Sequence, residues 1–252
     1  MIFFTHQGKQ YLPMKNLSPD TSPSLLGLRS IRLLAGLPDA VLADIAQVAQ
    51  FRRYRRGQTV VHREDPERDL CLISAGHVRV IMLSPSGREV RFRDIPAGGA
   101  FGEIAALDGQ PRCATVMALE DTLLVRIGPD LLGPLLQRHW PVCERLLCGL
   151  ALSLRHLTER VYELSALSVQ QRLVTELLRQ ASPSLDDDPR AWLDPAPRHA
   201  DLAATIGTTR EQVSRELAAL ARDGLVRRER GRLCVLDLCR LSDRLEGWPQ
   251  AA

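Results

Sequence analysis

Six apolar residues between positions 147 and 164 constrain the fold of this chain more than any other feature. They follow one another at intervals of 3, 4, 3, 4 and 3 residues: Leu147, Leu150, Leu154, Leu157, Val161 and Leu164. This spacing places all six on one narrow face of a long helix, as in the seam of a two-stranded coiled coil. The pattern therefore favours a dimer formed by two copies of this helix. The alternative is a helix buried against its own domain, which also carries an apolar stripe.

The sequence on the N-terminal side of this helix divides into three parts. Residues 1–22 are polar and rich in proline, which is typical of a loose arm. Residues 24–50 carry apolar side chains at helical spacing with a break at Gly36-Leu37-Pro38, which predicts two short helices. From about residue 52 to 126, short β-branched runs alternate with glycine and proline turns. This pattern predicts a small antiparallel barrel or sandwich, and helix is expected again from 130 to 181.

The C-terminal segment has the pattern of a helix-turn-helix. Residues 182–198 are rich in Pro, Asp and Ser and indicate a linker or long surface loop. Residues 199–206 form a short predicted helix, and Gly207 permits a tight turn. Thr208 and Glu211 have the spacing of a capping box that opens a second helix. Two helices joined by a short turn containing glycine are the helix-turn-helix motif.

The second of these helices has two distinct faces. Its apolar positions, Val213, Leu217 and Leu220, are predicted to be buried. The other face presents Arg210, Glu211, Ser214, Arg215 and Ala218. Arginine forks onto guanine and glutamate accepts from cytosine, so this face suits the major groove of DNA. The following hairpin carries four arginines placed to lie on phosphates: Arg227, Arg228, Arg230 and Arg232. The alternative is a surface helix with ion pairs such as Glu211 with Arg215.

Composition limits the remaining possibilities. A net charge of only +3 over 252 residues means that any DNA-binding surface must be local. The chain has no run of about 18 apolar residues and no signal-peptide pattern at its start. Its six cysteines are scattered and form no CxxC pair, so no zinc or cluster site is indicated. We therefore expect a cytoplasmic protein with reduced thiols.

Residues 101–116, FGEIAALDGQPRCATV, combine charged, glycine and apolar positions in a way that suits a nucleotide. The carboxylate of Glu103 can accept hydrogen bonds from two sugar hydroxyls, and Gly102 gives the backbone close access. The run Ile104-Ala105-Ala106 is expected to begin a short helix whose N-terminus favours an anion. Arg112 supplies a planar cation suited to a phosphate.

This stretch resembles the phosphate-binding cassette of cyclic-nucleotide-binding domains. Together with REQVSR at 210–215, it makes residues 25–248 resemble the cAMP receptor protein/FNR superfamily of bacterial transcription regulators. The resemblance implies an α+β chain: a flexible arm (1–22), a cyclic-nucleotide-binding β-roll (23–140), a dimerisation helix and hinge (141–181) and a winged helix-turn-helix domain (182–250). It implies a homodimer, not an enzyme, that binds a palindromic TGTGA-like DNA site under the control of cAMP or cGMP. RNA polymerase is the further partner that it implies.

The resemblance also assigns residues to the ligand site. They are Phe101, Gly102, Glu103, Ile104, Ala105, Arg112, Cys113, Ala114 and Thr158. Gly102 and Glu103 match the pair that meets phosphate and ribose, and Arg112 matches the phosphate arginine. Cys113 stands where Ser, Thr or Ala is usual. The family's adenine-contacting Thr and Ser correspond to Leu157 and Thr158, of which only Thr158 keeps a hydroxyl. A guanine base or a cyclic dinucleotide therefore stays open.

The DNA-binding residues that the resemblance implies lie around the second helix and the hairpin. They are Thr208, Thr209, Arg210, Glu211, Ser214, Arg215 and Arg230. Arg210, Glu211 and Arg215 match the base-reading positions of the cAMP-receptor branch, whereas Ser214 is more typical of other branches.

Four alternatives are set against this assignment. Iron–sulphur relatives need an N-terminal cysteine cluster, and residues 1–70 contain no cysteine. Haem-binding relatives lack the Gly-Glu and Arg pair, so we expect no haem, cluster or other metal. A regulator of the same fold that ignores nucleotides, or responds to oxidation through Cys113, is a second hypothesis. An enzyme acting on nucleotides is not favoured, because the cassette offers no metal ligands and no nucleophile–base pair.

Overall fold

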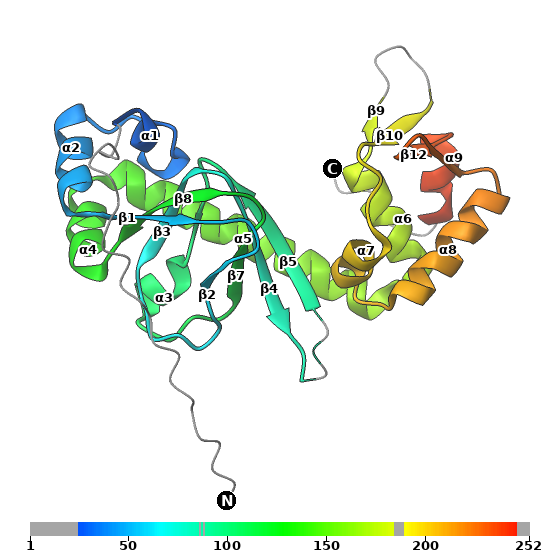
Figure 1. Cartoon of the computed structure of the whole chain (residues 1–252), viewed down its shortest axis with the longest axis horizontal. Helices are drawn as coiled ribbons and strands as arrows, with labels where there is room; N and C mark the ends of the chain where they lie inside the picture. Colours follow the sequence, from blue (N-terminus) through cyan, green and yellow to red (C-terminus); the bar gives the residue numbers. More distant parts are fainter. Residues whose placement is uncertain (1–24, 86, 88, 184–188, 246–252) are drawn as a thin grey trace, which may run out of the picture.

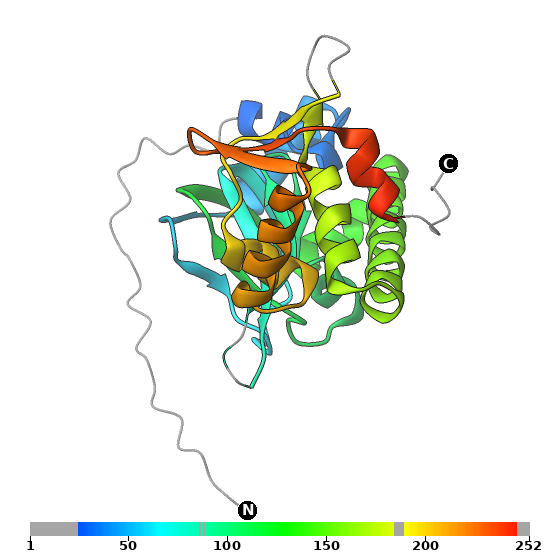
Figure 2. The ribbon, with the colours of Figure 1, turned by 90° about the vertical axis from the view of Figure 1, so that its right-hand side faces the viewer.

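The computed structural model describes residues 25–85, 87, 89–183 and 189–245, so the arm expected at 1–22 lies outside the described residues. The described chain forms two lobes (Figure 1). A long helix, α5 (Trp140–Ala166), runs from one lobe to the other. Seen from the C-terminal side, the smaller lobe lies in front of the β-rich lobe (Figure 2).

The N-terminal lobe is built on two four-stranded antiparallel sheets. One has the order β1-β8-β3-β6 and the other β2-β7-β4-β5. The first sheet contains β1 (Gln50–Tyr54), β8 (Thr122–Ile127), β3 (Leu70–Ala75) and β6 (Ala100–Phe101). The second contains β2 (Thr59–Val61), β7 (Thr115–Ala118), β4 (His77–Leu83) and β5 (Glu89–Pro96). Alternating side chains from both sheets form a core between them that includes Ile73, Val78 and Leu124.

Short helices cover the other face of the first sheet. They are α1 (Leu25–Arg29), η1 (Arg32–Leu34), α2 (Asp39–Val48) and α4 (Pro129–Arg138). Their apolar residues and the start of α5, at Val142 and Leu146, form a second core against this sheet. The break predicted at Gly36-Leu37-Pro38 is confirmed, because α2 begins directly after Pro38. The remaining helix, α3 (Glu103–Asp108), lies between β6 and β7 in the chain.

The C-terminal lobe has its own core. It contains α6 (Val169–Gln180), α7 (His199–Ile206), α8 (Arg210–Arg222), α9 (Leu238–Ser242) and η2 (Asp243–Leu245). A sheet of order β11-β12-β10-β9 completes it, formed by β11 (Val226–Glu229), β12 (Arg232–Val235), β10 (Ala191–Leu193) and β9 (Ser182–Pro183).

Two expectations about this lobe need correction. Residues 182–198 are not simply a linker, because β10 pairs with β12 and joins the wing sheet. β10 is only three residues long and lies among Pro and Asp residues, so the sequence pattern did not indicate a strand there. Residues 141–181 also do not form one unit, since α5 ends at Ala166 and α6 packs into the C-terminal core through Leu173 and Leu177. We therefore propose Leu167 as the boundary between the lobes.

The expected fold class is confirmed: a β-roll, a long helix and a winged helix-turn-helix follow one another along the chain. No helix in the described part of the chain combines the length and apolarity needed to cross a bilayer.

Candidate ligand site and nucleic-acid interface

The cassette begins at Gly102, where the chain turns from β6 into α3. Gly102 has a φ of 84°, in the left-handed region that glycine adopts without strain. A Cβ atom there would lie 2.2 Å from Nη1 of Arg112. Only glycine therefore allows the arginine to occupy its position next to this turn.

Arg112 is nearly enclosed, with 3% of its surface exposed. Its Nη1 donates to the carbonyl of Gly102 at 3.2 Å and its Nη2 to the carbonyl of Asp69 at 2.7 Å. Its Nε is buried and has no hydrogen-bond partner among the residues that the structure describes. A buried guanidinium with one unused donor costs free energy unless an acceptor reaches it. The arrangement fits an anion such as a cyclic phosphate.

A second buried arginine, Arg126, holds one of the residues that Arg112 contacts. Arg126 on β8 pairs with the carboxylates of Glu67 and Asp69, the latter at 2.7 Å. Burial alone would lower the pKa of Arg126, but its acidic neighbours, with Glu67 foremost, raise it above its ordinary value. These pairs hold Asp69, and with it the carbonyl that accepts from Arg112.

Glu103 is the first residue of α3, and its side chain is 13% exposed. Its Oε1 accepts from Nη2 of Arg93 on β5 at 3.0 Å. Nη1 of Arg93 donates to Oγ of Ser153 on α5 at 3.2 Å. The acid of the cassette is therefore connected to the long helix through one guanidinium.

The other predicted ligand residues differ in how far their side chains are buried. Phe101 and Ala105 are buried, Ala114 is partly buried, and Ile104 is 46% exposed. The Thr158 hydroxyl donates to the carbonyl of Leu154 in its own helix at 3.0 Å. The short helix predicted after Glu103 is present, but with six residues it adds little dipole, so Arg112 would carry the anion contact.

The thiols near the cassette differ in accessibility. Cys113 is exposed and Cys71 is buried, and both are free. Burial raises the pKa of Cys71 to about 11, so this thiol stays protonated at neutral pH.

The apolar stripe of α5 is not covered by its own lobe. Leu154 is 66% exposed and Val161 is 63% exposed, and Leu147, Leu157 and Leu164 are also exposed. Leu150 is partly buried. The alternative of a helix buried on its own β-roll is therefore wrong for this stretch: the part of α5 that packs on the roll is its start.

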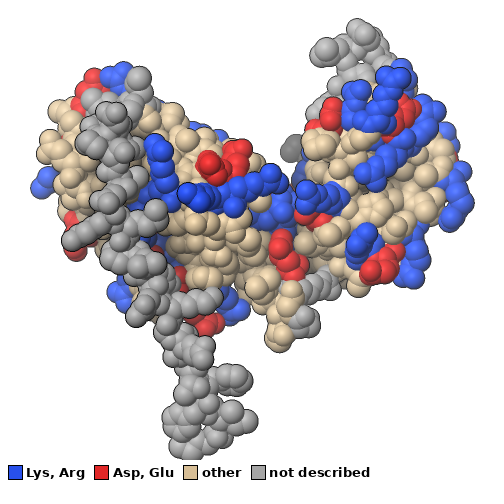
Figure 3. Space-filling view, in the orientation of Figure 1, with Lys and Arg blue, Asp and Glu red and all other residues tan. Residues whose placement is uncertain are grey.

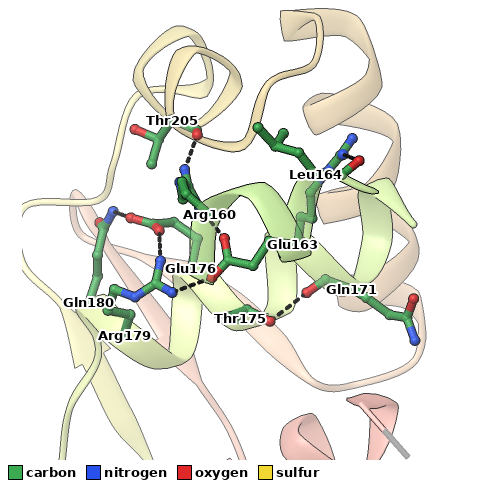
Figure 4. A network of polar contacts seen from close by, with 10 residues as sticks. Arg160, Glu163, Leu164, Gln171, Thr175, Glu176, Arg179, Gln180 and Thr205 are labelled. Atoms are coloured by element: carbon green, nitrogen blue, oxygen red, sulfur yellow. Dashed lines mark hydrogen bonds and ion pairs between the residues drawn. The ribbon is translucent and has the colours of Figure 1, made fainter. Parts of the chain in front are cut away.

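The end of α5 contains a buried acid. Glu163 accepts hydrogen bonds from Arg160 and from Arg179 of α6 (Figure 4). Arg179 also donates to Glu176 at 2.6 Å, and Gln180 donates to the same carboxylate. Burial alone would lower the pKa of Arg179, but Glu163 and Glu176 raise it overall. This network fixes the angle at which α6 leaves α5.

The same region contacts the first helix of the helix-turn-helix. Arg160 donates to the carbonyl of Thr205 on α7. Gly207, just after α7, packs so closely that a Cβ there would lie 2.8 Å from Cδ2 of Leu164. The β-roll makes a further contact, because Nη1 of Arg79 lies 3.5 Å from Oδ1 of Asp201. The position of α7 therefore depends on both the long helix and the β-roll.

The helix-turn-helix forms as predicted, with one shift at the cap. Gly207 ends α7 in a left-handed conformation and α8 begins at Arg210. The cap of α8 is Thr209, whose hydroxyl accepts from the backbone of Gln212 at 3.3 Å. The expected box of Thr208 and Glu211 is wrong by one residue, because Thr208 still bonds back to Ala203. Two adjacent threonines made the register ambiguous in the sequence.

The two faces of α8 are as the sequence predicted. Val213, Leu217 and Leu220 are buried in the lobe. Exposed on the other side are Arg210, Glu211, Ser214, Arg215 and Ala218. β11 and β12 form the wing, and Arg230 turns it with a φ of 44°. Arg side chains are spread over this lobe (Figure 3).

Comparison with known proteins identifies both lobes. Residues 51–139 match the profile of the cyclic nucleotide-binding domain, and residues 171–244 match the Crp-like helix-turn-helix domain. A cyclic AMP receptor protein of Thermus thermophilus is 34% identical over 184 residues, which are 71% of this chain and 80% of that protein. The chain belongs to the CRP/FNR family of transcription regulators.

Solved structures of CRP-family regulators share the fold. A transcriptional regulator of the CRP family from Thermus thermophilus is 25% identical with a TM-score of 0.61, covering 80% of this chain and 100% of that one. The c-di-GMP-responsive global regulator of Xanthomonas campestris is 23% identical with a TM-score of 0.65, covering 78% and 97%. This CRP-family chain is thus a transcription regulator with a cyclic nucleotide-binding domain and a helix-turn-helix DNA-binding domain.

The structure places two basic residues that the sequence analysis did not select, Arg198 and His199, beside the part of this CRP-family regulator that was predicted to bind DNA. Arg198, His199, Arg210 and Arg228 line a hollow of about 400 Å³ beside the start of α7. Partial burial, then Arg228 and Arg210, lower the pKa of His199. Arg198 and His199 directly precede and begin α7. Two basic residues at the start of α7 could have indicated a phosphate contact from the sequence. That they lie close to Arg228 on the wing could be known only from the structure.

Proposed function

We propose that this regulator is a homodimer that binds a palindromic, TGTGA-like DNA site under the control of a cyclic nucleotide. The single observation that carries effector control is the cassette geometry. Arg112 is buried beside Gly102 with an unused Nε donor, and Glu103 begins the adjoining helix. An acceptor for sugar hydroxyls and a cation for a phosphate are thereby held within one short segment.

The exposed stripe of α5 supports the dimer. A monomeric protein seldom leaves a continuous row of large apolar side chains in water. A second copy of α5 would cover the row by coiled-coil packing. The two α8 helices would then enter successive major grooves, about 34 Å apart. A protein with twofold symmetry binds a palindromic site. Because its proposed partner is DNA, we expect the regulator in the cytoplasm. RNA polymerase is the further partner that we propose there.

Control of DNA binding requires two conformations with different affinity for the effector. α5 is the element that can link them, because Ser153 contacts the Arg93–Glu103 pair and Arg160 contacts α7. A nucleotide at Glu103 would favour one seam geometry and thus one placement of the α8 pair.

Calorimetry on the full-length protein tests this proposal. cAMP, cGMP and cyclic di-GMP are titrated in turn into wild type, Glu103→Gln, Arg112→Ala and the surface control Arg53→Gln. We expect at least one nucleotide to bind, and Glu103→Gln to weaken it about 10- to 100-fold through loss of a charged hydrogen bond. Glu103→Gln preserves shape if Arg112→Ala fails to fold. If no nucleotide binds, or Glu103→Gln binds as tightly as wild type, effector control is rejected.

A nucleotide-independent regulator is the second candidate. It is favoured by the internal pairing of the cassette, where Glu103 bonds to Arg93 and Arg112 to two carbonyls. Cys113 is exposed in the same segment and offers an oxidisable thiol. DNA affinity that ignores every nucleotide but changes after mild oxidation, and not in Cys113→Ser, would support this candidate.

A further inference from the structure

Arg93 is a cation at the ligand site that the cassette motif does not contain. It comes from β5, whereas Glu103 and Arg112 belong to the cassette. Its Nη2 lies 3.0 Å from Oε1 of Glu103 and its Nη1 lies 3.2 Å from Oγ of Ser153. With 42% of its side chain exposed, it has room to exchange these partners for atoms of a ligand.

The parts of a nucleotide that would meet this arginine follow from the proposed function, on which this inference rests. In a cyclic nucleotide the phosphate bridges the 3′ and 5′ oxygens, and the base leaves C1′, next to the 2′-hydroxyl. A ribose whose 2′-hydroxyl is held by Glu103 therefore carries its base close to that carboxylate. Arg112 is turned toward the carbonyls of Gly102 and Asp69. Arg93 instead lies between Glu103 and α5, so a base carried next to the Glu103 carboxylate would come within its reach.

The group expected at this position from the sequence is Thr158. Its hydroxyl donates within α5, to the carbonyl of Leu154. Ser153, more than one turn earlier, is the α5 residue that reaches the Glu103 pair through Arg93. In this chain the Glu103 carboxylate is therefore met by the guanidinium of Arg93, whereas the Thr158 hydroxyl is bonded within α5.

We propose that Arg93 reads the base and selects a guanine-bearing cyclic nucleotide. A guanidinium donates two parallel hydrogen bonds, and guanine presents two adjacent acceptors, O6 and N7. Adenine presents N7 next to the N6 amino donor, so the same fork would set a donor against a donor. To form this fork, the guanidinium exchanges Ser153 and Oε1 of Glu103 for the two acceptors of the base, which leaves the Glu103 carboxylate free to accept the ribose hydroxyl.

The test is a comparison of affinities in full-length protein by calorimetry. The probes are cGMP, cAMP and cyclic IMP, which keeps O6 and N7 but lacks the amino group of guanine. We expect cGMP to bind at least about 10-fold more tightly than cAMP, and cyclic IMP to bind within about threefold of cGMP. Cyclic di-GMP is a fourth probe that separates a guanine mononucleotide from a dinucleotide as the source of the base.

Arg93→Gln and Arg93→Lys are then compared with Arg53→Gln, an exposed arginine on β1. Both Arg93 variants should reduce the cGMP-to-cAMP affinity ratio below about 3, since lysine keeps the charge but not the fork. Loss of a purely structural role would weaken both nucleotides together and leave the ratio unchanged.

The outcomes separate this inference from the proposed function. If no nucleotide binds wild type, effector control itself fails. If a nucleotide binds in a Glu103-dependent way, the inference is overturned by any of three results. These are cAMP binding as tightly as cGMP, cyclic IMP binding as weakly as cAMP, or an unchanged ratio in both Arg93 variants.

Discussion

Oε1 of Glu163 lies 2.6 Å from Nη2 of Arg179, which joins the end of the long helix to the first helix of the DNA-binding lobe. The glutamate is 1% exposed, whereas the arginine side chain is 46% exposed. A buried carboxylate depends on its cations, so loss of either partner of this pair is expected to destabilise the junction between the lobes.

Removal of this acid should loosen the junction. We expect Glu163→Ala to lower the free energy of unfolding by about 2–4 kcal/mol, because it removes the buried acceptor that Arg160 and Arg179 share and leaves each of them with only its second partner. Glu159→Ala, an exposed acid on the same helix, should stay within about 0.5 kcal/mol of wild type. Urea unfolding measures both. Equal effects in the two variants would show that the network does not stabilise the protein.

A charge on the apolar stripe should separate the proposed dimer. Leu154→Asp places a carboxylate in the seam, and we expect a monomer by analytical ultracentrifugation. Leu152→Asp is the matched control, because Leu152 is 55% exposed but lies outside the heptad spacing. A dimer in both variants would exclude this seam as the interface.

The exposed arginines of α8 and the wing should affect DNA binding in different ways. We expect Arg210→Ala to weaken binding to the specific site by about 1–3 kcal/mol, with little effect on unrelated duplexes. Arg230→Ala should weaken both kinds of duplex alike and reduce the salt dependence, as expected of a phosphate contact. Arg222→Ala, at the far end of α8, should change neither. Fluorescence anisotropy at fixed salt gives all three values, and uniform loss in Arg210→Ala would contradict its role as a base reader.

The hollow at His199 predicts a pH dependence of DNA binding. The pKa of His199 is lowered in the free protein by burial and by Arg228 and Arg210. DNA phosphates would stabilise the protonated ring and raise this pKa, so DNA binding is coupled to proton uptake at pH values between the pKa of His199 in the free protein and its pKa in the complex. The affinity for DNA should therefore increase as the pH falls from about 8 toward the pKa of His199 in the free protein, and His199→Gln should flatten this dependence of affinity on pH. Because the lowered pKa also makes acid destabilise the fold, each titration is kept above the onset of unfolding.

Gly102 should not tolerate a side chain. Alanine would be strained at a positive φ and would meet Nη1 of Arg112, whose distance to the added Cβ is 2.2 Å. Gly109→Ala is the control, because its φ of 71° imposes similar strain and the nearest atom, of Arg68, lies 3.6 Å away. We expect both variants to lose about 1–2 kcal/mol of stability and only Gly102→Ala to lose nucleotide binding as well. Calorimetry with the wild-type effector decides this, and equal nucleotide affinity in the two variants would remove the need for glycine at the cassette.

Features that depend on local periodicity could be predicted from the sequence. The stripe of α5 and the buried face of α8, from Val213 to Leu220, follow from helical spacing alone. A motif within one short segment indicated that Gly102 and Arg112 belong to the same site, and the two residues do lie next to each other. These predictions used residues that lie close together in the chain.

Contacts between distant segments could not be predicted in this way. Arg79 and Asp201 are 122 residues apart, and their contact depends on how the lobes are placed. Arg93 meets Glu103 only because β5 passes the start of α3 and reaches α5. Glu163 looks like any helical surface acid in the sequence, and its burial results from α6 folding back on α5.

Leu164 belongs to the apolar stripe and also packs on the glycine between α7 and α8. A partner helix that shifts along the stripe would therefore push against the turn of the DNA reader through one side chain. Substitutions that shorten or enlarge this leucine would therefore change how a shift of the partner helix affects the helix-turn-helix, although Leu164 itself would contact neither nucleotide nor DNA.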